Sequence, residues 1–286
     1  MAGTLTRTMK GFFFTRRLVA GTLLVAAGAA IVVTWHHFVP LLRNLAYLTG
    51  WCLLAVMLFL TAYNGRKKLP FLPLGSSHAW LQVHVYVGWL SVVGFFAHVG
   101  WRWPDGWFES CLTWLYLTVV VSGVLGLLWS RYVPRRLTAR GGEVLYERIP
   151  VIRRSLQERA EDLALRSVAA AQSSAIADFY IAHLSDFFRG PHNFWAHIVE
   201  IRTPWNRLQA KLDDLSRFLN PDQRQVLAEV TDFVRQKDGL DYQHALQLSL
   251  KLWLFVHVPL TYSLLIFTAL HVVLVHGFSV GAGYRP

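Results

Sequence analysis

Four histidines stand at matching positions in two apolar segments of the chain. HVYVGWLSVVGFFAH begins at His84 and ends at His98, and HVPLTYSLLIFTALH begins at His257 and ends at His271, so both pairs are fourteen residues apart. On a helix this separation comes within about 40° of four complete turns and spans about 21 Å. Both histidines of a segment therefore share one face. Imidazole is a good ligand for iron and other transition metals, and inside a membrane it needs a partner.

The composition predicts that these segments lie in a membrane. Of 286 residues, 54% are hydrophobic and only 16% are charged, which is unusual for a soluble domain. Five apolar runs approach the roughly 20 residues that cross a bilayer, and the first is longer than a signal sequence requires, so it is interpreted as a retained anchor. We expect an all-α integral membrane bundle with five transmembrane helices, at residues 18–36, 45–63, 79–99, 110–130 and 251–276.

The long stretch between the fourth and fifth spans has a different character. The expected organisation is 1–130 for spans one to four, 131–250 for a helical cytoplasmic insertion, and 251–286 for span five with a short outer tail. Apolar residues three and four apart predict one long amphipathic helix over residues 151–188. Further helices are expected to begin near Thr203 and at Asn220 and Pro221. Gly239 and Asp241 are expected to interrupt the last of these before a helix continues into span five.

The distribution of basic residues predicts an orientation. Arg and Lys cluster before the first span and between the second and third, at Arg66, Lys67 and Lys68, whereas the opposite turns contain only Arg43 and Arg102. Short basic loops stay on the cytoplasmic side. We therefore expect the inner membrane of the cell, with the N-terminus cytoplasmic and the C-terminus outside. The net charge of +11 is partly explained in this way, and no basic and aromatic cluster indicates nucleic-acid binding.

The two histidine-bearing spans run parallel in this topology, so His84 is expected to face His257, and His98 to face His271. Two imidazoles from neighbouring helices can take both axial positions of a haem iron. Gly88 and Gly94 lie four residues from a histidine and leave room for a flat ring. A single membrane histidine is more often a hydrogen-bonded core residue, but two spans with identical spacing favour ligation. The expected cofactors are two haem b groups, with these four histidines as metal ligands.

These paired histidines resemble those of the ferric reductase and NADPH oxidase type of transmembrane dihaem cytochrome b. The resemblance covers the core spans only, lacks the flavin domain, and does not cover the insertion. It implies two stacked b haems that pass single electrons between the membrane faces. The four-helix cytochrome b subunits of membrane hydrogenases and formate dehydrogenases are a second, weaker resemblance.

The expected function is therefore that of an electron-transfer subunit in a membrane oxidoreductase complex, with no catalytic residues of its own. Expected partners are flavin, iron–sulfur or multihaem cytochrome subunits, with a quinone as a further candidate and membrane lipid around the spans. The alternative is a transporter or channel whose histidines line a path for protons or metal ions. A purely structural anchor is a third option. Apart from Glu109 at a boundary, the spans carry no Asp or Glu, which weighs against transport. Two cysteines, Cys52 and Cys111, form no CxxC motif and are expected to be buried thiols.

Overall fold

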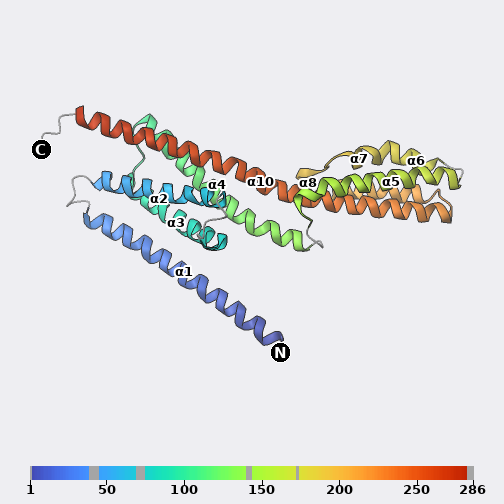
Figure 1. Ribbon diagram of the computed structural model, residues 1–286, viewed down its shortest axis with the longest axis horizontal. Helices are drawn as coiled ribbons and strands as arrows, with labels where there is room; N and C mark the ends of the chain where they lie inside the picture. Colours follow the sequence, from blue (N-terminus) through green and yellow to red (C-terminus); the bar gives the residue numbers. More distant parts are fainter. Residues whose placement is uncertain (1, 39–44, 69–74, 140–143, 172–173, 282–286) are drawn as a thin grey trace. The chain divides into compact units, whose positions relative to one another are not determined.

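The structure is a computed structural model that describes residues 2–38, 45–68, 75–139, 144–171 and 174–281 (Figure 1). Within these ranges the chain forms helices and no strand, so the all-α prediction is confirmed. Five helices are long and apolar enough to cross a membrane, as predicted. Arg43 and the last five residues of the tail lie outside the described ranges.

The chain divides into two compact units, which are described separately. The first contains residues 1–123 and 256–286, and the second contains residues 124–255. We call them the membrane unit and the charged unit. Helix α4 (Trp107–Ala139) and helix α10 (Pro221–Gly281) each contribute residues to both units.

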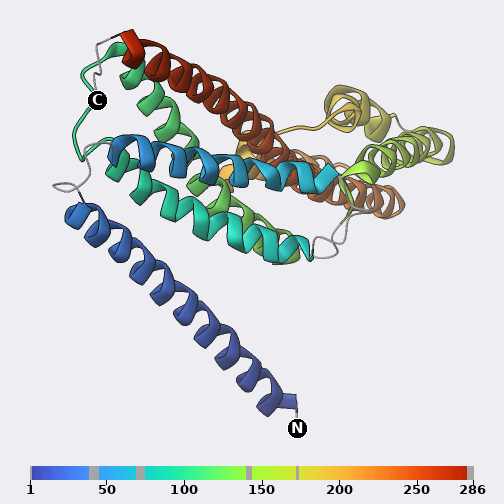
Figure 2. The ribbon, with the colours of Figure 1, turned by 60° about the vertical axis from the view of Figure 1, so that its left-hand side comes forward.

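Close backbone packing in the membrane unit involves α1 (Ala2–Phe38), α2 (Leu45–Lys68) and α3 (Ser77–His98). The backbone of α3 approaches both α1 and α2, and α2 and α3 lie side by side in Figure 2. Helix α3 begins where the Ser76 side chain accepts a hydrogen bond from the amide of Ala79, an ordinary N-cap. In the apolar windows of α2 and α10 only 6% of residues are buried, and the other side chains there are exposed or half-buried.

The exposed surface of the membrane unit corrects one expectation. Cys52 and Cys111 are both exposed, so the prediction of buried thiols is wrong. The reason is that an apolar side chain in a membrane helix can point outward at no cost, because lipid replaces the protein core as its surroundings.

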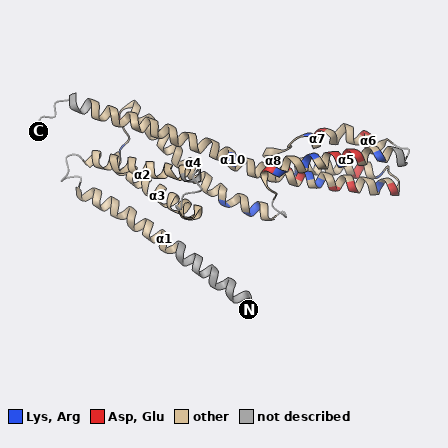
Figure 3. Ribbon diagram, viewed as in Figure 1, with Lys and Arg blue, Asp and Glu red and all other residues tan. Residues whose placement is uncertain are grey.

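The charged unit has a hydrophobic core of its own, of the kind found in soluble helical domains. Its helices are α5 (Ile149–Ala171), α6 (Ala175–Phe179), a π-helical turn (Tyr180–Leu184), α7 (Ser185–Arg189), α8 (Phe194–Val199) and α9 (Thr203–Ser216), joined by the flanking parts of α4 and α10. A buried cluster that includes Leu156, Phe188, Leu212 and Val234 joins these helices. Lys, Arg, Asp and Glu concentrate on them, whereas residues 45–65 of α2 and the whole of α3 contain none (Figure 3).

Two sequence predictions for this unit are wrong. The single long helix expected over residues 151–188 is a helical hairpin, in which α5 ends at Ala171 and packs against α6 and α7. Both arms carry apolar residues at helical spacing because both face the same core, so periodicity alone does not reveal the break. The interruption expected at Gly239 and Asp241 is absent, since α10 runs through both residues. Buried contacts of Lys237 and Asp241 hold the helix together there.

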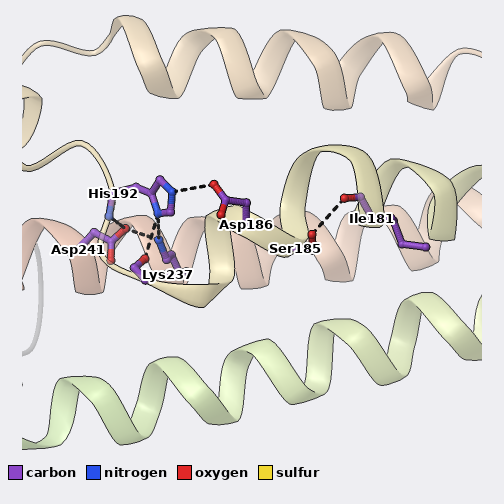
Figure 4. Close-up of polar contacts among 7 residues, drawn as sticks. Ile181, Ser185, Asp186, His192, Lys237 and Asp241 are labelled. Atoms are coloured by element: carbon purple, nitrogen blue, oxygen red, sulfur yellow. Dashed lines mark hydrogen bonds and ion pairs between the residues drawn. The ribbon is translucent and has the colours of Figure 1, made fainter.

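Lys237 and Asp241 form a buried ion pair on α10 (Figure 4). Their side chains are 0% and 1% exposed. Asp241 also accepts a hydrogen bond from the backbone amide of His192 (3.1 Å), and the Lys237 ammonium lies 3.9 Å from the centre of the Phe187 ring. Burial lowers the pKa of Lys237 and raises the pKa of Asp241, while the attraction between the two opposes both shifts. The pair thus connects α10 to the segment that follows α7.

Removing one member of this pair should destabilise the charged unit strongly. Lys237→Met leaves a buried carboxylate without its counter-ion, and we expect a loss of about 3–5 kcal/mol in the free energy of unfolding, measured by denaturation of the full chain in detergent. The double variant Lys237→Met/Asp241→Leu should recover much of the loss. Lys251→Met is the control, because Lys251 pairs with Glu147 on the surface and an exposed pair contributes about 1 kcal/mol or less. Equal losses for both lysines would contradict this assignment.

Candidate functional site

The histidines of α3 lie on one continuous stripe of the helix. His84, Gly88, Ser91, Phe95 and His98 follow one another at alternating spacings of four and three residues, and none of them is exposed. This spacing keeps side chains on one face of a helix. Both His84 and His98 are half-buried, on the common helix face that their spacing predicts.

The histidines of α10 repeat this arrangement. His257, Thr261, Leu264, Thr268 and His271 follow the same alternation and are buried or half-buried. The residues just before this stripe point outward, with Phe255 78% exposed. The hydroxyls of Thr261 and Thr268 donate to backbone carbonyls of their own helix, at 2.9 and 2.7 Å. Because both threonine hydroxyls bond to α10 itself, the two imidazoles are the polar groups of this stripe that can reach other helices.

The first pair of histidines, His84 and His257, is held by two different helices. His84 Nδ1 donates to the carbonyl of Leu60 on α2 at 3.1 Å, and its ring lies 5.2 Å from that of Tyr63. His257 Nδ1 lies 3.2 Å from the hydroxyl oxygen of Ser122 on α4. A Cβ on the neighbouring Gly123 would stand 3.6 Å from the His257 ring, an ordinary contact. The direct opposition of these two histidines across a shared cofactor stays a prediction.

The second pair, His98 and His271, lies near the other ends of the same stripes. His98 Nδ1 donates to the carbonyl of Ala46 at 3.1 Å and lies 3.3 Å from the Thr49 hydroxyl. The His271 ring is stacked 6.3 Å from that of Phe108, and its buried Nδ1 has no hydrogen-bond partner in the part of the chain that the structure describes.

Between the two levels of histidines lies a small apolar cluster. Phe95 stacks on Tyr116 of α4 at 4.2 Å, and the Tyr116 hydroxyl lies 2.9 Å from that of Ser91. Leu264 and Met57 complete this cluster. Ser91 and Leu264 are each midway between the histidines of their helix, so the two histidine levels are separated by packed side chains.

Two glycines on α3 have open space where a side chain would be. A Cβ built on Gly88 or Gly94 meets no atom within 4 Å. Gly50 on α2 is different, because a Cβ there would come within 2.9 Å of His98 Cε1. Gly88 and Gly94 were identified from sequence, whereas Gly50, Thr49 and Ser122 were not. Their only sequence signal is that they are small residues within apolar spans.

The donor set fits a haem iron with two imidazole ligands. An imidazole that donates through Nδ1 carries its lone pair on Nε2, and fixing one nitrogen by a hydrogen bond is typical of metal-bound histidine. His84 and His98 meet that condition with backbone carbonyls. The open space beside Gly88 and Gly94 is a further observation in favour of the fit.

A further histidine of the membrane unit, His276, contacts aromatic residues of another helix. Its ring contacts the edges of Tyr47 and Trp51 on α2, at 5.7 and 5.8 Å, and its Nδ1 donates to the carbonyl of Val272 on its own helix at 3.0 Å. His276 is five residues beyond His271 and therefore about 140° further round the helix, and these aromatic contacts give it a different environment from the four histidines above.

No family model, curated protein or solved structure matched the chain. Among the described residues there is also no group of three or more His, Cys, Asp or Glu side chains that would hold a metal ion. A haem iron takes only two ligands from the protein, so this finding bears on ion sites with a larger protein ligand set.

Adding a methyl group at Gly50 should displace the His98 ring. Gly50→Ala is expected to cost about 1–3 kcal/mol in the free energy of unfolding, because the ring loses its contacts with Ala46 and Thr49, each worth roughly 0.5–1.5 kcal/mol. Gly65→Ala is the matched control on the same helix, since a Cβ there meets nothing within 4 Å.

Introducing Gly50→Ala into the His98→Ala variant tests whether the clash with the His98 ring causes the loss of stability. If the clash with the ring is the reason for the loss, Gly50→Ala should cost nothing once the ring is absent, and thermal unfolding of the four variants gives the interaction energy directly. A loss that persists in the His98→Ala background would attribute the effect to helix packing.

Proposed function

We propose that the chain is the membrane subunit of an oxidoreductase complex, a dihaem cytochrome b that carries single electrons across the bilayer. The observation that supports this best is the pair of matching stripes on α3 and α10, each with a half-buried histidine at both ends. In this proposal His84 and His257 hold one haem b, and His98 and His271 hold the other. Bound haem supplies a one-electron redox couple that no side chain of this protein provides.

The residues around the histidines have defined tasks in this proposal. The Leu60 and Ala46 carbonyls orient His84 and His98 through Nδ1, and the Ser122 hydroxyl does the same for His257. Such second partners fix the ring and strengthen it as a ligand. Gly88 and Gly94 leave space beside α3. The cluster around Phe95 and Tyr116 keeps the two cofactor sites apart.

The surroundings suit an electron carrier better than an ion path. Apart from Glu109 in the first turn of α4, the apolar spans carry no Asp or Glu, and transport paths for protons or cations usually contain them. Apolar side chains around a redox centre lower the local dielectric and thereby help to set its potential.

The proposed redox partners differ between the two faces of the membrane. We propose the inner membrane of the cell, with the N-terminus and the charged unit cytoplasmic and the C-terminus outside, on the basis of the basic turns. On the cytoplasmic side the charged unit offers a docking surface for a flavin or iron–sulfur subunit, and at the outer face a multihaem cytochrome would exchange electrons with the His98 and His271 site. A quinone is a further candidate at either face.

Haem content provides the direct test. The purified chain should contain two haem b per protein, with sharp reduced visible bands and a pyridine adduct. His84→Ala and His271→Ala should each retain about one haem, because each removes one axial ligand from a different site. His276→Ala is the matched control and should retain two, since that ring contacts Tyr47 and Trp51 instead. A colourless preparation with bound zinc would favour the transporter alternative instead.

The Ser122 hydroxyl should tune one of the two sites selectively. Without it His257 loses a hydrogen bond at Nδ1 and becomes a weaker donor, so Ser122→Ala should raise the midpoint potential of one haem and leave the other unchanged in a redox titration. Thr118→Ala is the control, because that hydroxyl donates to the Trp114 carbonyl of its own helix at 2.7 Å. Equal shifts of both potentials in Ser122→Ala would argue against a local role.

A further inference from the structure

Helix α8 of the charged unit is tied to the end of α4 by one arginine. Arg136 is 7% exposed and donates to the backbone carbonyls of His197 (2.9 Å) and Ile198 (2.7 Å). It also pairs with Glu200 at 2.8 Å, and Ile198 packs against the cluster formed by Val133 and its neighbours. Helix α8 is therefore fixed in position along α4.

This position is close to the place where α4 leaves the membrane. Its apolar run ends at Ser130, and Arg136 is six residues further on, a rise of about 9 Å. The headgroup layer on each face of a bilayer is roughly 5–8 Å deep. The antiparallel partner α10 has its boundary at a similar level, because Trp129 donates to the Ser249 hydroxyl at 2.7 Å and Lys251 is the last charge before the apolar run.

At this level α8 exposes apolar side chains. Trp195 and Val199 are 74% and 65% exposed, and Ile201, just after the helix, is 53% exposed. Trp195 and Val199 are four residues apart, so they share one face of the helix. We call these three residues the α8 patch. Tryptophan is enriched where a protein meets the membrane interface, because its ring is apolar and its N–H is polar.

The charges around the α8 patch complement lipid headgroups. Arg131 and Arg135 are exposed on α4, and Arg202 is exposed directly after Ile201. The acidic residue of this segment, Glu200, is already paired with Arg136. Basic side chains at such a boundary are attracted to anionic lipid phosphates. Tyr132, 46% exposed on α4, adds a second aromatic residue.

From these observations we infer that α8 is an interfacial membrane anchor of the charged unit. The α8 patch lies in the headgroup layer of the membrane face at which α4 ends, and the neighbouring arginines contact lipid phosphates. The partner is the lipid surface, and the role is to hold the charged unit against it. This inference is independent of the haem proposal, because it rests only on residues of the charged unit.

Spin labels can measure the depth of the patch directly. Cys52 and Cys111 are replaced by alanine, and single cysteines are introduced as Trp195→Cys, Val199→Cys and, as a matched control, Phe218→Cys. Phe218 is 85% exposed, belongs to the same unit, and lies beyond α9. The full chain is placed in nanodiscs of phosphatidylcholine and phosphatidylglycerol, and collision rates with oxygen and with a water-soluble nickel chelate are compared.

We expect the labels at positions 195 and 199 to collide several-fold more with oxygen, relative to nickel, than the label at 218. Trp195→Glu in the Val199-labelled chain should shift that label toward the aqueous value, whereas Phe218→Glu should leave it unchanged. Equal aqueous accessibility at 195, 199 and 218 would overturn the inference. Labels shielded from both reagents would overturn it too, since they would indicate contact with another protein chain or a second copy.

Discussion

An imidazole placed among apolar helices must find a partner, and this requirement organises the membrane unit. Each of the residues His84, His98 and His257 reaches a neighbouring helix through Nδ1, to a carbonyl of α2 or a hydroxyl of α4. The small residue Gly50 allows α2 to approach the His98 ring. Because lipid offers no driving force for apolar helices to associate, these polar contacts and the cluster around Tyr116 specify which helices meet.

The two units accommodate polar side chains away from water in different ways. In the membrane unit charged residues are nearly absent from the spans, and polar side chains such as Ser91 and Tyr116 or Thr49 and His98 contact one another. In the charged unit one ion pair is buried completely, with Lys237 and Asp241 compensating one another beneath Phe187. Helix α10 contributes to both arrangements, because it contains the Lys237–Asp241 ion pair as well as His257 and His271.

Much of the architecture could be predicted from local sequence patterns. The five spans follow from apolar length, and the common stripe of His84 and His98 follows from helical periodicity alone. The hairpin of α5 and α7 could not be predicted in this way, because the apolar spacing continues on both sides of the break. The partners of the histidines were also inaccessible, since Ser122 and His257 are 135 residues apart and Thr49 and His98 are 49 apart. Only tertiary packing decides which small residue lies against which ring.

The core shared by the ends of α4 and α10 has a consequence for biosynthesis. Val133 and Leu137 are buried against Tyr242 and Leu246, residues that the ribosome adds more than a hundred positions later. The charged unit therefore cannot close while it is being translated from its first residues, and it must wait until the start of the last span has emerged. Insertion of that span into the bilayer and completion of the charged unit are thus late, linked steps in the maturation of the nascent chain.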